Sequence, residues 1–152
     1  RNSENWFWEG QRYPKGGFRL DGSTPLDTYL GCDWQWLNIE IHAPHDGPVT
    51  SPKLFVGVPV SFRVKPSPMV WTPQGDDRDD GINYYSTRLP NIGRGGRGNA
   101  HAAFYFKADK PGPFTIRYHI ESDNLPRFER TFSVTGVPGM PPDWKKDPCT
   151  WQ

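Results

Sequence analysis

Residues 102–134 constrain the fold more than any other part of the chain, because their apolar side chains recur at every second position. Residues 114–121 have the sequence Phe-Thr-Ile-Arg-Tyr-His-Ile-Glu, in which apolar and polar side chains alternate. The run 103–107 before them ends in the turn signal Asp-Lys-Pro-Gly at 109–112, and a third run alternates over 128–134. This pattern is typical of half-buried β-strands joined by tight turns.

The same alternation occurs earlier in the chain. Apolar residues alternate with polar ones from Leu37 to Ile41, and residues 53–56 and 58–65 follow as further strands. Within 58–65 the apolar residues share one face, and Pro59 indicates that this strand begins at a sheet edge or a bulge. Several short strands separated by Gly and Pro turns predict an all-β fold, an antiparallel two-sheet sandwich with Greek-key connections.

The pattern divides the chain, which at 152 residues is expected to form one domain, into three parts. Residues 1–32 have aromatic residues but no sustained period, which predicts an irregular N-terminal arm. Residues 33–135 form the sandwich, and residues 136–152 form a Pro-rich C-terminal tail. Within the sandwich, residues 66–100 have almost no periodicity and are expected to form a long central loop, which is either functional or contains short elements that the pattern does not resolve.

Residues 53–134 resemble immunoglobulin-like and cupredoxin-like domains. The resemblance rests on the Gly-Val-Pro-Val strand entry at 57–60 and on the Ala-Asp-Lys-Pro-Gly hairpin at 108–112. It implies a two-sheet sandwich and, for a cupredoxin, a copper-ligating Cys at the end of the strand after the hairpin. Residues 118–121 at that place are Tyr-His-Ile-Glu, without a Cys, so a blue-copper centre is not expected.

The charge balance limits the partners. Lys and Arg number 18 against 17 Asp and Glu, so the net charge of +1 provides no global attraction to nucleic acid. No apolar run approaches the roughly 20 residues of a membrane-spanning helix. We therefore expect no nucleic-acid partner and no transmembrane segment in this chain.

Two cysteines are present, Cys32 and Cys149. We predict that they form a disulfide, because the tail has little apolar pattern to hold it against the domain; two buried free thiols are the alternative. A disulfide in turn predicts an extracytoplasmic location, either periplasmic, secreted or at the cell surface.

Two groups of residues are candidate metal ligands. Asp76, Asp77, Asp79 and Asp80 lie within five consecutive residues inside the predicted loop, and calcium prefers such carboxylates, although an exposed acidic turn is the alternative. His42 and His45 stand three positions apart at a strand end, as ligands of zinc or copper can. No cofactor is expected, with calcium as the alternative.

Aromatic and arginine residues mark candidate binding surfaces. The N-terminal arm carries Trp6, Phe7, Trp8 and Tyr13, residue types that are enriched at protein interfaces; packing of the arm over one end of its own domain is the alternative. Arg94 and Arg97 stand in a Gly-rich loop and can hold a partner's carboxylate or phosphate, with a plain flexible loop as the alternative. The loop lacks the strand and helix that a dinucleotide site requires. Trp71, Tyr84 and Tyr85 are candidates for stacking on a sugar.

No motif for catalysis is present: the chain lacks a Gly-x-Ser-x-Gly elbow, a His-Glu-x-x-His pair and a phosphate loop. The sequence therefore favours a non-catalytic β-sandwich that acts through protein-protein contacts, as an accessory or assembly subunit of a larger complex. The alternatives are a carbohydrate-binding module that recognises a polysaccharide and a metal-binding domain.

Overall fold

The structure, a computed structural model, describes residues 6–9, 18–32, 34–44, 47–65, 71–77, 81–93 and 99–140. This part of the chain forms strands and no helix, and so contains no helix able to cross a bilayer. The strands are β1 (Trp6–Glu9), β2 (Arg19–Pro25), β3 (Asp27–Tyr29), β4 (Gln35–His42), β5 (Lys53–Pro59), β6 (Arg63–Lys65), β7 (Thr72–Asp77), β8 (Ile82–Arg88), β9 (Asn99–Lys107), β10 (Gly112–Glu121) and β11 (Phe128–Val137).

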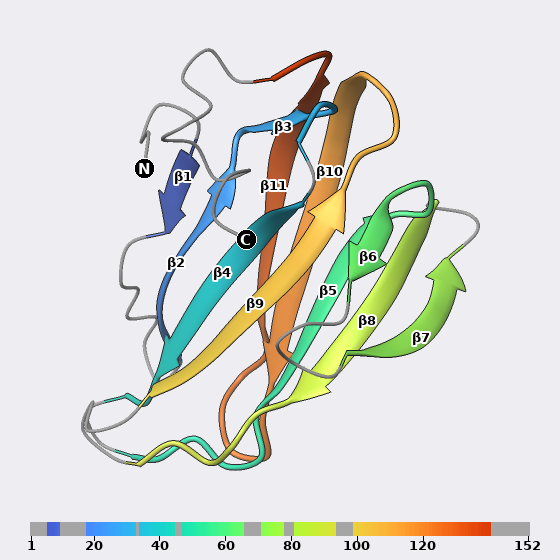
Figure 1. Cartoon of the computed structure of the whole chain (residues 1–152). Coiled ribbons are helices and arrows are strands. Elements are labelled where there is room, and N and C mark those ends of the chain that lie inside the picture. Colours follow the sequence, from blue (N-terminus) through green and yellow to red (C-terminus); the bar gives the residue numbers. More distant parts are fainter. Residues whose placement is uncertain are drawn as a thin grey trace.

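The strands form two sheets that face each other as the layers of a sandwich (Figure 1). Sheet A has the order β1-β2-β4-β9-β6, and sheet B has the order β3-β11-β10-β5-β8-β7. All described strand pairs are antiparallel except β3 and β11, which run parallel. The predicted all-β two-sheet sandwich is confirmed, and the Greek-key connections stay a prediction.

The core lies between the sheets and consists of the alternating residues that the sequence indicates. Leu37 and Ile41 of β4 are at most 1% exposed, and they belong to the same buried cluster as Ile116 and Ile120 of β10. The hydrophobic effect stabilises such a cluster in proportion to the apolar area removed from water. The polar residues between them consequently face outward from each sheet.

The expectation of an irregular arm over residues 1–32 is wrong for the described part. β2 lies between β1 and β4, and β3 pairs with β11. Leu20 is fully buried, and Gln35 fastens β3 because its Nε2 donates to Asp27 O (3.2 Å) and its Oε1 accepts from Tyr29 N (3.1 Å). Backbone pairing needs no apolar alternation, so these strands left no periodic signal.

The expected long loop over residues 66–100 also contains strands. β8 pairs on one side with β5 and on the other with β7. Ile82 and Ser86 fall on one face of β8 and Thr87 on the other, yet all three are buried, at 5%, 2% and 7% exposure. Because both faces of this strand are covered, buried and exposed residues do not alternate, and the strand could not be recognised.

Two predicted strand ends also differ from the structure. The run 58–65 is not one strand: β5 ends at Pro59, Val60 is 47% exposed in the following turn, and the chain then enters sheet A as β6. At the C-terminal side, β11 continues to Val137, past the predicted boundary at residue 135. The rest of the predicted tail from residue 141 lies outside the described residues.

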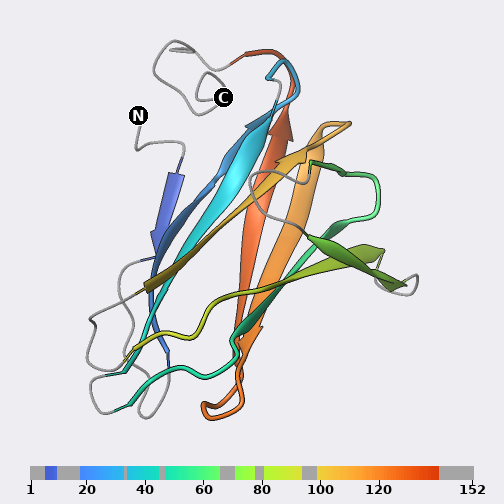
Figure 2. The same ribbon diagram turned by 60° about the horizontal axis from the view of Figure 1, so that its bottom comes forward.

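One end of the sandwich, at the bottom of Figures 1 and 2, is held by hydrogen bonds between the connections that follow β4, β8 and β10. Val49 and Ile92 exchange backbone hydrogen bonds of 2.9 and 3.0 Å. Asn124 accepts from Thr50 N (3.0 Å) and donates to Pro48 O (2.8 Å). These bonds join the three connections to one another at the end of sheet B, next to the site described below.

Candidate functional site

The candidate site is the outer face of sheet B, the side of the sheet that points away from the core. In β10 the alternation buries Ile116 and Ile120 and turns Arg117, His119 and Glu121 outward. The register of the neighbouring strands brings further side chains to the same face. These are Lys53, Phe55, Tyr84, Arg88, Glu129 and Thr131.

The centre of this face is a stack of Phe55 and His119. The two residues are Cα partners on β5 and β10, and their rings lie 4.3 Å apart at 16°. Lys53 Nζ lies 5.1 Å from the centre of the Phe55 ring, and the ring of Tyr84 lies 6.5 Å from that of His119. The stack leaves 15% of the His119 side chain exposed.

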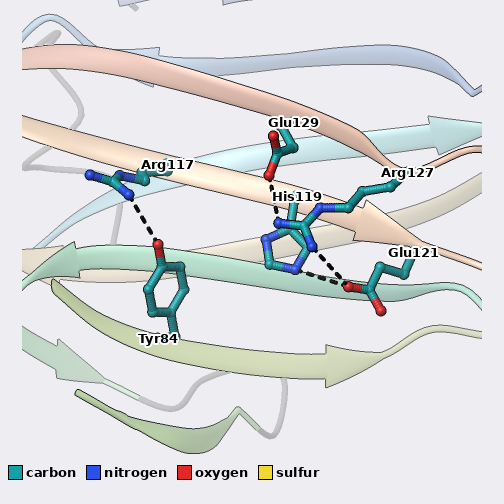
Figure 3. A network of polar contacts seen from close by, with 6 residues as sticks. All are labelled: Tyr84, Arg117, His119, Glu121, Arg127 and Glu129. Atoms are coloured by element: carbon teal, nitrogen blue, oxygen red, sulfur yellow. Dashed lines mark hydrogen bonds and ion pairs between the residues drawn. The ribbon is translucent and has the colours of Figure 1, made fainter. Parts of the chain in front are cut away.

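A charged network borders the stack (Figure 3). Arg127 lies between two carboxylates, with Nη1 at 3.5 Å from Glu121 Oε2 and Nη2 at 2.5 Å from Glu129 Oε1. His119 Nε2 lies 3.3 Å from the same Oε2 of Glu121. These groups come from β10, β11 and the turn between them, so the hairpin itself assembles the network.

Burial against Phe55 lowers the pKa of His119 below 6.5, and the positive charge of Arg127 lowers this pKa further. The carboxylates of Glu121 and Glu129 raise the pKa of His119, but these opposing effects do not cancel the lowering. At neutral pH the imidazole is therefore uncharged, and the network is held together by Arg127 and the two glutamates.

Acidification is expected to destabilise the protein through His119. Its folded-state pKa lies below the unfolded value, so the unfolded chain takes up the proton first. The stability that the neutral imidazole of His119 contributes is fully present above the unfolded pKa and is lost as the pH falls through the folded pKa. The melting temperature should fall as the pH drops below the unfolded pKa of about 6.5, and His119→Gln should reduce that fall. His101→Gln, on the outer face of sheet A, is the control; an unchanged slope in His119→Gln contradicts the assignment.

Tyr84 lies across Gly57, and the absence of a side chain at that glycine makes room for it. Gly57 is the Cα partner of both Tyr84 and Arg117, and Arg117 Nη1 donates to Tyr84 Oη over it at 3.3 Å. A Cβ at position 57 would lie 2.7 Å from Tyr84 Cε1 and 2.8 Å from Ile82 Cγ2. Glycine at this position therefore determines where the Tyr84 ring lies on the outer face.

Gly57→Ala should displace Tyr84 and lower the free energy of unfolding by about 1–3 kcal/mol, because overpacking forces side chains out of their preferred positions. Gly47→Ala is the matched control, since no atom lies within 4 Å of the Cβ that it adds. Urea unfolding of both variants measures the difference. Equal stability of the two variants would show that the Tyr84 ring yields without cost.

Two pockets open on this face, one on each side of the Phe55–His119 stack. One has a volume of about 150 Å³, and the other, toward the end of the sheet, has a volume of about 250 Å³. Residues that line the smaller pocket include Tyr84, Arg117, His119, Arg127, Glu129 and Thr131. Residues that line the larger pocket include Ser51, Lys53, Phe55, Arg88, Glu121 and Asp123.

The described part of this face shows no arrangement of side chains for catalysis. His119 and Glu121 are spaced like a base and its orienting carboxylate, but within the described residues no hydroxyl or thiol forms a hydrogen bond with His119. No three His, Cys, Asp or Glu side chains of the described ranges are placed to hold a metal ion. The face presents aromatic rings and guanidinium groups, residue types that are enriched at protein interfaces, together with carboxylates.

The structure corrects the predicted carbohydrate site. Trp71 is 5% exposed, its ring packs edge-on against Phe104 at 5.0 Å, and its Nε1 donates to Ala103 O at 3.2 Å. Tyr85 also packs against the core, and burial raises the pKa of its hydroxyl. Of the three candidates only Tyr84 lies on the outer face, because neighbouring residues of one strand point to opposite sides.

The other predicted site residues are placed only in part. His42 Nε2 lies 3.1 Å from Glu40 Oε1. The backbones of Trp6, Phe7 and Trp8 form β1 and pair with β2, and Asp76 and Asp77 end β7. Cys32 is 3% exposed. The remaining predicted site residues lie outside the described residues: Tyr13, His45, Asp79, Asp80, Arg94, Arg97 and Cys149. The disulfide, the metal ligands and the arginine loop therefore stay predictions.

The sequence did not single out a second aromatic group, on the outer face of sheet A. Trp36 and Tyr105 are Cα partners with rings 5.7 Å apart, and Lys65 Nζ lies 5.1 Å from the Tyr105 ring. Trp34 extends the group, with Lys65 Nζ at 5.3 Å from its ring. Its signal was the outward position of Trp36 within an alternating strand.

No family model and no curated protein matches this chain. Among solved structures, a cohesin module from a Clostridium perfringens family 33 glycoside hydrolase is similar over 82% of this chain and 100% of that one, with 8% identity and a TM-score of 0.52. A CARDB domain from Pyrococcus furiosus, solved with di-metal ions, is similar over 85% of this chain and 93% of that one, with 14% identity and a TM-score of 0.48.

A conjugative transposon lipoprotein from Bacteroides eggerthii is 12% identical over 77% of this chain and 95% of its own, with a TM-score of 0.45. At these identities the similarity concerns the fold alone. The comparison confirms the immunoglobulin-like β-sandwich resemblance at the level of the fold.

Proposed function

We propose that this protein is a non-catalytic, extracytoplasmic β-sandwich that binds a protein partner through the outer face of sheet B, as an accessory or assembly subunit of a larger complex. The observation that carries the proposal is the Phe55–His119 stack, with Arg117, Arg127 and Tyr84 around it. Aromatic residues and arginine dominate the binding energy of protein interfaces, because they combine large apolar area with directed hydrogen bonds.

The side chains of this face are held in place by one another at neutral pH, which supports the same function. Arg127 is held by two carboxylates and Tyr84 by Arg117, so the side chains lose little conformational freedom when a partner binds. The uncharged His119 adds apolar area without a desolvated charge at the centre of the surface. The extracytoplasmic location rests on the predicted Cys32–Cys149 disulfide, which an oxidising compartment would preserve.

The test compares two aromatic pairs on opposite faces. The chain carrying an affinity tag is expressed in its own cells, the particle is isolated gently, and its native mass is measured. The native mass of the wild-type particle should exceed the 17.4 kDa of this sequence by the mass of a partner protein that is present in a fixed ratio. Phe55→Ala with His119→Ala should dissociate it, whereas Trp36→Ala with Tyr105→Ala should not. A monomeric wild-type protein, or equal loss in both variants, contradicts the proposal.

A carbohydrate-binding function is the second candidate, and it concerns the outer face of sheet A. The tilted pair of Trp36 and Tyr105 gives two neighbouring rings on adjacent strands, on which a sugar chain can stack. A glycan array tests this candidate with the same two double variants in exchanged roles. Trp36→Ala with Tyr105→Ala should abolish polysaccharide binding, and Phe55→Ala with His119→Ala should leave the binding unchanged. Absence of any glycan signal from the wild-type protein removes this candidate.

A further inference from the structure

The larger pocket on the outer face of sheet B has features that the proposed function does not use. It lies at the hydrogen-bonded end of the sandwich, next to the Phe55 ring, and has a volume of about 250 Å³. Its lining combines the cations Lys53 and Arg88, the ring of Phe55 and the carboxylates of Glu121 and Asp123.

The two cations of this pocket lie beside each other. Lys53 and Arg88 are Cα partners on β5 and β8, and Lys53 is also the Cα partner of Glu121 on β10. Within the described residues neither cation forms an ion pair. Like charges at directly opposed positions of neighbouring strands destabilise a sheet. A ligand anion between them would replace this repulsion with two attractive contacts, one of which Arg88 can make with both of its terminal nitrogens.

The two carboxylates of the pocket differ in how far neighbouring cations compensate their charge. Glu121 is already compensated by Arg127 at 3.5 Å, so its charge opposes an incoming anion only weakly. Asp123 has no such partner among the described residues and belongs to the connection after β10, where its backbone N donates to Thr50 O at 2.9 Å. An anion is therefore repelled from the Asp123 side and drawn toward Lys53 and Arg88.

The rim of the pocket is held in an uncommon backbone conformation. Ser51 has a φ of +52°, in the left-handed region that non-glycine residues seldom adopt. Its backbone N donates to Asn91 Oδ1 at 2.8 Å, and Leu89 N donates to Pro52 O at 2.9 Å. Such strain persists only where surrounding contacts impose it, and it concentrates at binding sites.

We propose that this pocket binds an acidic side chain of the protein partner, with the carboxylate between Lys53 and Arg88 and an adjacent apolar group against Phe55. The proposal rests on the proposed function and names the chemistry of the partner's contact. Charge complementarity carries it: the two cations, which form no ion pair within the described residues, and the neighbouring ring match a carboxylate that is carried next to apolar surface.

The probe is 3-phenylpropionate, which has one carboxylate and one ring, and the matched neutral probe is 3-phenylpropionamide. In a titration followed by NMR, the carboxylate should shift the amide signals of Ser51, Lys53, Phe55 and Arg88 in a saturable way, with roughly millimolar affinity. The amide should bind about tenfold more weakly, because it lacks the charge-assisted hydrogen bonds. Added salt should weaken the carboxylate alone.

Lys53→Met with Arg88→Met is the test variant. Its melting temperature should stay close to that of the wild type, because the substitution removes both the repulsion between Lys53 and Arg88 and the attraction of Lys53 to Glu121 and to the Phe55 ring. Its affinity for 3-phenylpropionate should fall about tenfold. Equal binding of the two probes, shifts on another face, absence of binding, or unchanged affinity in the variant would overturn the proposal. The native mass of the wild-type particle is independent of this titration: a persistent complex with a failed titration refutes the carboxylate site alone, and a monomeric protein refutes the proposed function.

Discussion

Phe104→Ala is expected to lower the free energy of unfolding by about 3–5 kcal/mol, which is a large part of the stability of a domain of this size. Phe104 is 1% exposed on β9 in the interior of sheet A. Its ring packs edge-on against Trp71 at 5.0 Å and lies 5.6 Å from Tyr85, and both of these residues adjoin sheet B. The truncation removes apolar contacts between the layers and leaves a cavity that flanking strands cannot close.

Equilibrium unfolding in urea, followed by circular dichroism, measures this loss. Thr131→Ser on the exposed outer face of sheet B is the control and should change the stability by no more than about 0.5 kcal/mol. A loss in Phe104→Ala as small as in the control would contradict the assignment of this ring to the contact between the two sheets.

Reduction of the predicted Cys32–Cys149 disulfide should lower the free energy of unfolding by about 2–5 kcal/mol. In the chain-entropy model the bond closes a loop of more than roughly 100 residues and so restricts the unfolded chain strongly. Cys32 is 3% exposed in a turn whose Gly31 N donates to Gly139 O at 2.8 Å, so the bond would fasten the tail beside the end of β11.

Alkylation of the denatured protein, with and without prior reduction, decides whether the bond exists. We expect no alkylated cysteine before reduction and two after it, as intact mass spectrometry resolves. Cys32→Ser with Cys149→Ser should match the stability of the reduced protein. Alkylation of both thiols without a reductant would contradict the disulfide and remove the argument for an oxidising compartment.

The half-buried strands were predictable from sequence because each exposes one face to water. Leu37 to Ile41 and residues 114–121 alternate for that reason, and they form β4 and β10. β8 could not be recognised, because Ile82, Ser86 and Thr87 are buried on both of its faces. β2 and β3 are defined by backbone pairing with distant strands, which no local pattern encodes.

The candidate site was predictable only strand by strand. The alternation in β10 placed Arg117 and His119 on its polar face, as the structure has them. Their meeting with Phe55 and Tyr84 depends on the register between β10, β5 and β8, which joins residues far apart in the chain. The aromatic character of Trp71 suggested a surface ring, whereas packing against Phe104 placed it in the core.

Hydroxyl-radical footprinting of the isolated particle tests the central claim most directly, because it reports the solvent access of individual side chains. Compared with the free protein, the complex should protect Phe55, Tyr84 and His119 from oxidation while Trp36 and Tyr105 react equally in both states. Protection of Trp36 and Tyr105 with unchanged oxidation of Phe55 and His119 would show that the partner binds elsewhere and would contradict the account.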